Sequence, residues 1–329
     1  MQRMKVTTLT ALVLCTVFIS GCGRHSKKEN YYLISVSTKL PYWQTMADGF
    51  NKAAAEYGVT ASVRGPEDYD PQAELTALQR AAATKPAGIL ISVSDPSVLS
   101  AEINATVNAG IPVITVDSDA VASRRLFFIG TNNLEAGRLG GRRLVDKLEG
   151  KGNVVIFTLA GQPNVEERLK GIKDVFADYP EMKIVDVVDI KGNTIKAFDV
   201  TRRYMAQTGE NKVDAFICLD SASGKIVSDA IKRTGATDRV LVAWDVNEDT
   251  LNAIKDGDID STVAQKPFTM GYVGLRALDQ VYHNPPNNMT RDWSADPFSP
   301  FPVFVDTGTS LVDKSNVDPY LEAAARMKQ

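Results

Sequence analysis

The feature that most constrains the fold is a regular alternation of short apolar runs with longer segments of helical periodicity. Between residues 31 and 116, the runs YLISVS, GILISVS and PVITV are separated by such segments, which begin at Pro41, Pro71 and Pro96. In the first segment the apolar side chains recur every three or four positions, as on one face of a helix; they are Trp43, Met46, Ala47, Phe50, Ala54 and Tyr57. Proline is common in the first turn of a helix. Continuous apolar runs are typical of parallel strands covered by helices on both faces, so the predicted fold class is α/β.

The same rhythm starts again in the second half of the chain. After RLFFIG (125–130), the runs NVVIFTL, KIVDVVDI, DAFICL and VLVAW alternate with helical segments at 165–179, 195–207 and after Ser223. We therefore predict two doubly wound parallel-sheet lobes of similar size. The segments that remain are too few for a third lobe, so they must return to the first two.

The two predicted lobes share the chain between them. Lobe 1 is expected to comprise residues 31–130 and 266–299, and lobe 2 residues 131–265 and 300–329. The chain then crosses three times between the lobes and forms a hinge. The crossings are expected near 130–132, at 265–266 and around the Pro- and Asn-rich loop at 283–301.

The first 21 residues are predicted to be a signal peptide that is not part of the fold. A basic start, MQRMK, is followed by the apolar run VTTLTALVLCTVF, which is shorter than the ~20 residues of a membrane-spanning helix. The run leads into ISGC, which resembles a bacterial lipobox, so we expect cleavage before Cys22 and a lipid on its thiol. Residues 22–30 are then a polar tether. The alternative is a cytosolic protein with an apolar N-terminus.

Histidine and cysteine usage excludes several chemistries. The chain has two histidines, His25 in the predicted tether and His283 near a helix end, and neither context offers a catalytic arrangement with a nucleophile. A Ser-His-Asp or Cys-His arrangement and a zinc site are therefore not expected, and we predict neither a metal nor another cofactor. Cys218, alone inside an apolar run, is predicted to be buried and inert. With 37 basic and 40 acidic residues, the chain lacks the basic excess expected of a nucleic-acid-binding protein.

Three of the apolar runs deliver an aspartate at their end. VITVDSD runs into Asp117, AFICLD ends on Asp220, and VLVAWD ends on Asp245. In open α/β sheets, ligands bind outside the carboxyl ends of the strands. Since Asp117 belongs to the first predicted lobe and the other two to the second, we expect the three acids to converge on a cleft between the lobes. The alternative for each is that it caps the helix that follows.

Several motifs, taken in their order and spacing, resemble the ribose-type sugar-binding proteins of bacterial ABC importers. They are STKLPYW, GIPVITVDSD, FIGTNNLEAGRLGG, NVEERLKGI, LVAWDVNEDTLNAIKDGDIDSTVAQKPFTMGY and DTGTSLVDKSNVDPYL, within a match that runs from Tyr31 to about Tyr320. The resemblance implies the type I periplasmic-binding-protein fold, with the solute held between two hinged lobes. It also implies a monomeric binding protein, not an enzyme, in the periplasm or cell envelope, anchored by its lipid, that delivers a sugar or polyol to an ABC permease in the inner membrane.

The resemblance further implies a set of ligand-binding residues. In the family, an aromatic pair after the first strand covers the apolar face of a sugar ring, and polar side chains from both lobes bond its hydroxyls. The matching residues are Tyr42, Trp43, Asp117, Asn164, Arg168, Asp220, Asp245 and Gln265. Aspartate only accepts hydrogen bonds, arginine only donates them, and Asn and Gln do both, so such a set can satisfy every hydroxyl. The alternative for Tyr42 and Trp43 is packing in the core of their helix.

Three positions depart from the pattern of the ribose binders. Leu40 stands where they have an asparagine, Gly192 where they have an aromatic residue, and Ser118 where they have an arginine. Another pentose, a hexose or a polyol is therefore as well supported as ribose.

Two other functions remain open at this point. One is a sensor that passes its sugar-bound form to a membrane receptor, and the other is a glycoside-processing enzyme that uses paired carboxylates. A sugar-responsive transcription regulator would need DNA-binding helices where this chain has its predicted signal peptide. Two shorter motifs are predicted to be structural: DGDIDS (256–261) is a helix-to-strand turn, and GRLGG (137–141) allows close packing of a helix.

Overall fold

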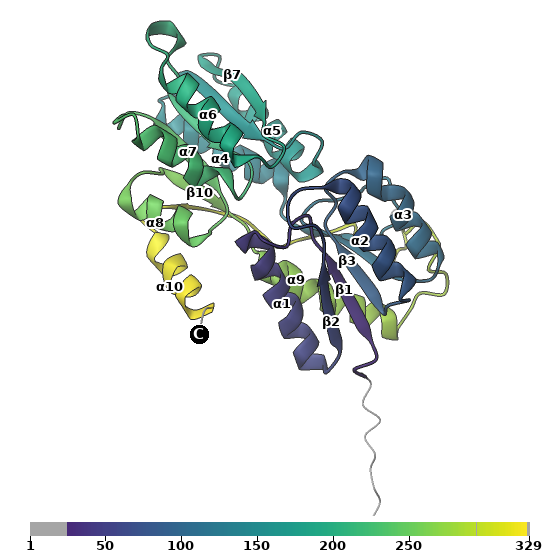
Figure 1. Cartoon of the computed structure of the whole chain (residues 1–329). Helices are drawn as coiled ribbons and strands as arrows, with labels where there is room; N and C mark the ends of the chain where they lie inside the picture. Colours follow the sequence, from purple (N-terminus) through teal and green to yellow (C-terminus); the bar gives the residue numbers. More distant parts are fainter. Residues whose placement is uncertain (1–24, 294, 328–329) are drawn as a thin grey trace, which may run out of the picture.

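The computed structural model describes residues 25–293 and 295–327, and it contains two α/β lobes (Figure 1). The first lobe is built on a six-stranded sheet in which all neighbouring strands are parallel, with the order β11-β5-β4-β3-β1-β2. Its strands are β1 (Asn30–Ile34), β2 (Thr60–Arg64), β3 (Gly88–Ile91), β4 (Val113–Val116), β5 (Phe128–Gly130) and β11 (Phe304–Asp306).

The second lobe repeats this topology. Its sheet has the order β12-β10-β9-β8-β6-β7, with all pairs parallel except the edge strand β12 against β10. The strands are β6 (Gly152–Thr158), β7 (Met182–Asp189), β8 (Ala215–Cys218), β9 (Val240–Trp244), β10 (Ser261–Ala264) and β12 (Ser310–Asp313). Strand β4 of the first lobe therefore corresponds to β9 of the second, and β5 to β10.

Helices cover both faces of each sheet, as the continuous apolar strands predict. In the first lobe α1 (Pro41–Tyr57) and α9 (Pro267–His283) pack together on one face, and α2 (Pro71–Ala83) and α3 (Pro96–Asn108) lie on the other. In the second lobe α4 and α5 share one face, and α6, α7, α8 and α10 share the other. The bounds are α4 (Asn133–Lys147), α5 (Pro163–Phe176), α6 (Thr194–Met205), η1 (Gly209–Asn211), α7 (Ser223–Lys232), α8 (Glu248–Asp256) and α10 (Val317–Met327).

Glycines bring one helix pair in each lobe into backbone contact. A Cβ added at Gly49 of α1 would lie 2.0 Å from the carbonyl oxygen of Phe268 in α9. The second lobe has the same arrangement, because a Cβ at Gly137 of α4 would lie 2.1 Å from the carbonyl oxygen of Arg168 in α5. Only glycine permits this approach, which confirms the prediction made for GRLGG. The contact also sets the position of Arg168 along the axis of α5 relative to α4.

The chain crosses between the lobes three times, and one predicted crossing is wrong. Two crossings follow β5 and β10, at 131–132 and 265–266. The third lies between β11 and β12, at 307–309, and not in the Pro-rich loop. The predicted boundary at residue 300 is therefore too early, since β11 pairs in register with β5 of the first sheet.

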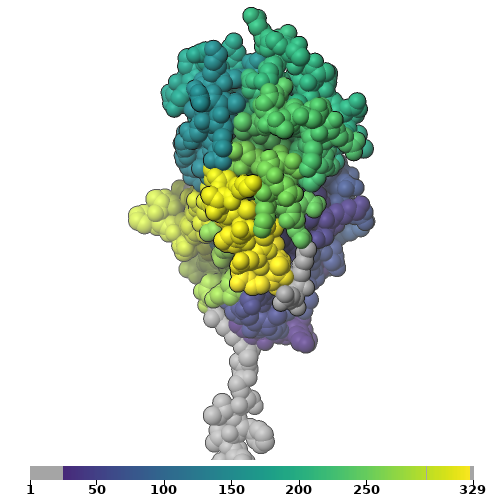
Figure 2. Space-filling model, turned by 90° about the vertical axis from the view of Figure 1, so that its left-hand side faces the viewer, coloured from purple at the N-terminus to yellow at the C-terminus, as the bar shows by residue number. Residues whose placement is uncertain are grey.

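The Pro-rich loop belongs wholly to the first lobe. The ring of Phe301 stacks on Phe127 at 6.0 Å, and Trp293 packs edge-on against Phe301 at 5.7 Å. Beyond the loop, Phe304 in β11 stacks on Phe128 in β5 at 5.2 Å. In Figure 2 the yellow-green part of the chain that carries the loop projects from the side of the molecule. These aromatic contacts could not be read from the local sequence, because Phe127 and Phe128 lie far from the loop along the chain.

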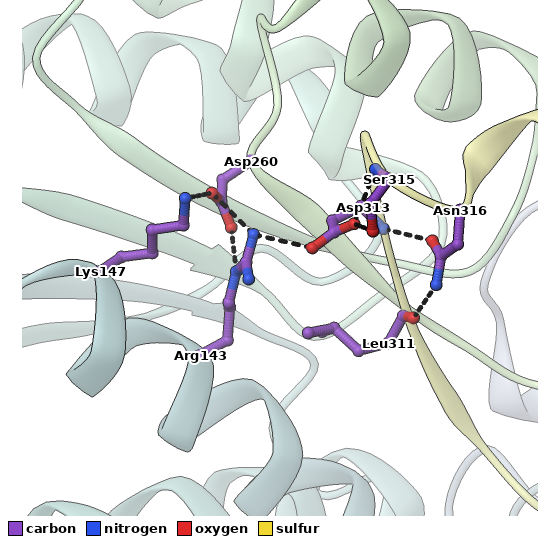
Figure 3. A network of polar contacts seen from close by, with 7 residues as sticks. All are labelled: Arg143, Lys147, Asp260, Leu311, Asp313, Ser315 and Asn316. Atoms are coloured by element: carbon purple, nitrogen blue, oxygen red, sulfur yellow. Dashed lines mark hydrogen bonds and ion pairs between the residues drawn. The ribbon is translucent and has the colours of Figure 1, made fainter.

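A charged network fastens β12 to the second lobe (Figure 3). Arg143 of α4 donates from Nε to Asp260 Oδ2 at 2.6 Å, and its Nη2 lies 3.2 Å from Asp313 Oδ2 at the end of β12. Lys147, one turn further along α4, lies 2.9 Å from Asp260 Oδ1. Burial alone would raise the pKa of Asp260, but the bonds from Arg143 and Lys147 outweigh it and lower the pKa. The network therefore holds the strand that follows the third crossing.

The N-terminal segment differs from the predicted tether. The predicted signal peptide and Cys22 lie outside the described residues. From His25 onward the chain is docked on the first lobe, where the His25 ring stacks on Tyr57 at 4.8 Å, and β1 begins at Asn30. Among the described residues, none of the helices combines the length and the hydrophobicity that crossing a membrane requires. Cys218 is buried as predicted, and burial raises the pKa of its thiol.

Candidate functional site: a cavity between the lobes

A cavity of about 250 Å³ lies between the two lobes, at the carboxyl ends of both sheets. All eight residues predicted to bind ligand line it: Tyr42, Trp43, Asp117, Asn164, Arg168, Asp220, Asp245 and Gln265. Its volume is below the roughly 300–1,000 Å³ typical of pockets for drug-sized ligands, so the cavity suits a small solute. The cavity lies where parallel sheets place their ligands.

Asp117 and Asp245 occupy equivalent places in the two lobes. Asp117 follows β4 and has φ +62°, while Asp245 follows β9 and has φ +65°. Each backbone N–H still bonds to the neighbouring strand, to Ile129 O at 3.0 Å and to Val263 O at 2.9 Å. Aspartate tolerates this left-handed conformation better than most residues with a Cβ. At this sharp turn the aspartate side chain lies in the wall of the cavity in each lobe.

The helix-capping alternative is wrong for Asp245, whereas Asp220 bonds to the residues at which α7 begins, although Ala222 occupies the cap position. Helix α8, which follows Asp245, is capped by Asn247, whose Oδ1 accepts from Thr250 N at 2.9 Å. Asp220 Oδ1 instead accepts from the backbone N–H groups of Ala222 and Ser223, at 2.9 Å each, and its Oδ2 accepts from the Ser223 hydroxyl. Asp220 therefore lines the cavity while it holds the start of α7.

Arg168 reaches the cavity from the buried face of α5. Its Nε donates to Asn133 Oδ1 at 2.9 Å and its Nη1 to the Leu219 carbonyl at 2.8 Å, while the guanidinium lies 4.9 Å from the centre of the Trp244 ring. The side chain is thus held by three neighbours, and the residue is only 2% exposed. Its Nη2 is buried and has no hydrogen-bond partner within the described part of the chain. An unsatisfied buried donor of this kind is costly unless a ligand accepts from it.

Two acceptors at the cavity are in the same condition. Gln265 donates from Nε2 to Asp245 Oδ1 at 3.0 Å, and Gln162 donates from Nε2 to Asn164 Oδ1 at 2.9 Å. The Oε1 atoms of both glutamines are buried and lack a partner among the residues described. Among the described residues, the cavity wall therefore has one donor and two acceptors that could form hydrogen bonds with a ligand. The sequence prediction missed Gln162, whose only signal is its place just after β6 and before Pro163.

A hydrogen-bonded chain of side chains crosses the cleft. Asp117 of the first lobe accepts from Tyr42 Oη at 2.6 Å and from Asn164 Nδ2 of the second lobe at 2.9 Å. Tyr42 and Trp43 pack edge to face at 5.1 Å, and both also belong to the apolar core beneath α1. The predicted place at the ligand site and the alternative of core packing are therefore both correct for this pair, since the rings line the cavity and also pack in the core beneath α1.

Gly192 of the second lobe lies against Tyr69 of the first lobe in the cavity wall. Gly192 lines the cavity with φ +73°, and a Cβ placed on it would lie 3.1 Å from Cβ of Tyr69. Tyr69 is also part of the cavity wall, and its hydroxyl donates to the Ser94 carbonyl at 3.2 Å. The departure at Gly192 thus makes room for a ring from the first lobe. Leu40 also lines the cavity, whereas Ser118 is buried behind it.

The electrostatics of the cavity are dominated by its acids. Burial raises the pKa of Asp117, and it raises the pKa of Asp245 to about 7, although the positive charge of Arg168 opposes both shifts. Burial, with the nearby charges of Asp117 and Asp245, also raises the pKa of Tyr42 well above its usual value. A site lined by one guanidinium and four aspartates, Asp68, Asp117, Asp220 and Asp245, suits a neutral solute that donates several hydrogen bonds.

The cavity between two hinged α/β lobes defines a solute-binding protein. The model of the periplasmic binding protein domain family matches residues 31–284, so the chain belongs to this family. It is accordingly a binding protein and not an enzyme.

Three known proteins illustrate the similarity. The ribose import binding protein RbsB of Haemophilus influenzae is 27% identical over 282 residues, which cover 84% of this chain and 93% of that protein. A sugar-binding protein of a sugar ABC transporter from Bacillus halodurans is 32% identical, with a TM-score of 0.76 over 89% of this chain and 99% of that chain. The arabinose-binding protein AraP of Geobacillus stearothermophilus is 30% identical, with a TM-score of 0.73 and the same coverage.

Proposed function

We propose that the protein captures a monosaccharide or a small polyol between its lobes and delivers it to an ABC import permease. The observation that carries this proposal is the unsatisfied polar lining of the cavity, with Arg168 Nη2 as donor and the Oε1 atoms of Gln162 and Gln265 as acceptors. Each such group costs about 1–3 kcal/mol when it is buried without a partner. A solute with closely spaced hydroxyls can both accept from the arginine and donate to the amides and carboxylates.

The ligand would also favour the closed arrangement of the lobes. Tyr42, Trp43 and Asp117 come from the first lobe, and Arg168 and Gln265 from the second or its boundary, so a solute that contacts all of them bridges the cleft. A ligand shifts a conformational equilibrium by its difference in affinity for the two states. The three connecting segments at 131–132, 265–266 and 307–309 form the hinge about which the lobes would open.

Delivery to a permease and the location of the protein are inferred from its similarity to known binding proteins and from its N-terminal sequence. The similar proteins are named for ribose import and for a sugar ABC transporter. The predicted signal peptide and the lipobox-like ISGC would place the protein in the periplasm or cell envelope, anchored through a lipid on Cys22. Globomycin inhibition of lipoprotein processing, which would leave a larger precursor, tests the anchor independently of sugar binding.

Isothermal titration calorimetry against D-ribose, L-arabinose, D-xylose, D-galactose and xylitol tests the proposed ligand class. We expect one of these or a close epimer to bind with a Kd at or below the micromolar range and with one site per chain. Arg168→Gln should weaken that binding at least about tenfold, since it removes charge-assisted bonds from the cavity. Asp318→Asn, at an exposed ion pair outside the cavity, is the matched control and should leave the affinity unchanged. No binding by any pentose, hexose or polyol would overturn the proposal.

A further inference from the structure

The start of β1 lies at the end of the first lobe that is away from the second lobe (Figure 1). The two histidines of the chain meet beside it. His25 and Glu29 precede β1, and Asp279 and His283 lie one turn apart in the last turns of α9. His25 Nε2 is 3.1 Å from Asp279 Oδ2, and His283 Nε2 is 3.0 Å from Glu29 Oε2 and 3.5 Å from Asp279 Oδ1. We call these four residues the His–carboxylate cluster.

The side chains of the His–carboxylate cluster are largely buried and held in place. Their exposed fractions are 23% for His25, 11% for Glu29, 7% for Asp279 and 14% for His283. The His25 ring is stacked on Tyr57, and it meets the His283 ring edge-on with the centroids 4.9 Å apart. Tyr31 Oη donates to Asp279 Oδ1 at 3.1 Å. A hydrogen bond that orients a carboxylate from behind is a common feature of metal sites.

The distances in the cluster match those between ligands of one tetrahedral metal ion. Bonds of about 2.0–2.2 Å to nitrogen and oxygen place neighbouring ligand atoms roughly 3.3 Å apart in a tetrahedron. The three nitrogen–oxygen distances of 3.0, 3.1 and 3.5 Å bracket this value. Ligand atoms of His25, Asp279 and His283 all lie within 4.8 Å of one another. A small shift of side chains can therefore bring them around one ion.

We infer that the His–carboxylate cluster binds a divalent transition-metal ion of the Zn²⁺ class. Two imidazoles with one or two carboxylates form a ligand set that binds Zn²⁺ in preference to Mg²⁺ or Ca²⁺, because the latter two ions prefer oxygen ligands alone. Asp279 and His283 are spaced i, i+4 on one helix, so both face the same direction. The sequence analysis predicted no metal, because 254 residues separate His25 from Asp279 and only the fold brings them together.

The metal would tie the N-terminal segment to the end of α9. In that role it would fix the direction in which the chain leaves the first lobe towards residue 22. The site is independent of the sugar cavity, because α9 begins just after Gln265 and its 17 residues span about 25 Å. The alternative without metal is that each imidazole only forms a hydrogen bond with its neighbouring carboxylate.

Titration of ZnCl₂ into the full chain distinguishes the two cases. The chain is purified in detergent without a polyhistidine tag, treated with a chelator and dialysed before calorimetry. We expect one Zn²⁺ per chain with a Kd in the micromolar range or below. His25→Gln and His283→Gln should each weaken binding at least 30-fold, whereas Lys27→Gln, an exposed change in the same segment, should leave it unaltered. Co²⁺ should give the visible absorption of a tetrahedral site, and the two histidine variants should lose it.

Two results would overturn the inference. One is the absence of Zn²⁺ binding below about 100 µM, which is roughly a hundred times weaker than the micromolar affinity expected of a built site. The other is binding at several sites that both histidine variants retain, which would indicate exposed carboxylates elsewhere. Circular dichroism of the variants, and their unchanged affinity for the sugar, show that the fold survives. Because the readout is metal alone, failure of the proposed sugar function would leave this test unaffected.

Discussion

The burial of Asp245 predicts that its carboxylate destabilises the ligand-free protein at neutral and alkaline pH. Its pKa rises from the usual 3.8 to about 7 on folding, chiefly because burial disfavours the charged form. At about 1.4 kcal/mol per unit, this shift corresponds to roughly 4 kcal/mol. An acid whose pKa is raised on folding binds its proton more tightly in the folded protein, so its effect on stability depends on pH.

The direction of the effect follows from the two pKa values. Below pH 3.8 the carboxyl is protonated in both states and contributes nothing. As the pH rises towards about 7, the unfolded chain loses this proton first, so the free energy of unfolding falls. Above about pH 7 the group is ionised in both states and the full cost is present. Asp245→Asn removes the charge and keeps an oxygen that can accept from Gln265 Nε2.

Urea unfolding at pH 4 and pH 8, followed by tryptophan fluorescence, measures this difference. Trp244 lies beside Asp245 and reports on the second lobe. We expect Asp245→Asn to match the wild type at pH 4 and to be more stable at pH 8, by up to about 4 kcal/mol. The same variant should bind the sugar more weakly, since stability and function conflict at such sites. Equal differences at both pH values would refute the burial of this carboxylate in the ligand-free protein.

Three further changes test the packing and the polar contacts of the site. Gly137→Ala should destabilise the protein by at least about 2 kcal/mol in thermal or urea unfolding, because its Cβ would meet the Arg168 carbonyl at 2.1 Å. Gly140→Ala is its control, since its nearest neighbour is a side-chain end at 3.1 Å, and an equal loss would contradict this reasoning. Asp220→Ala should cost about 1 kcal/mol in the same assay, because the backbone N–H groups of Ala222 and Ser223 at the start of α7 lose their acceptor, and no loss would mean that these bonds are unimportant. Tyr42→Phe should weaken sugar binding about tenfold in calorimetry, because Asp117 loses a 2.6 Å bond, and unchanged affinity would count against a role for that bond.

The sequence was sufficient where the physical cause is local. The apolar runs predicted the two parallel sheets, and Pro41 marks the start of a helix that ends at Tyr57, as expected. DGDIDS is the predicted turn, in which Gly257 ends α8 with φ +87° and β10 begins at Ser261. The eight residues that the resemblance implied also line one cavity, which lies at the carboxyl ends of both sheets.

Tertiary structure alone decided which partner each polar group and each late segment finds. Asp220 and Asp245 both end apolar strands and both line the cavity, yet only Asp220 also bonds to the start of the next helix, since Asn247 takes the capping position after Asp245. β11 joins the first sheet because its edge is open beside β5, which moves the third crossing out of the Pro-rich loop.

The histidines show the same limit most clearly. His25 and His283 lie near opposite ends of the chain, and their contact depends on the docking of the N-terminal segment against the end of α9. Periodicity and spacing determine which residues form strands and helices, because these depend on neighbours within a few positions. Contacts between distant segments depend on how the finished elements pack, and in this protein that packing completes the sugar cavity and assembles the His–carboxylate cluster.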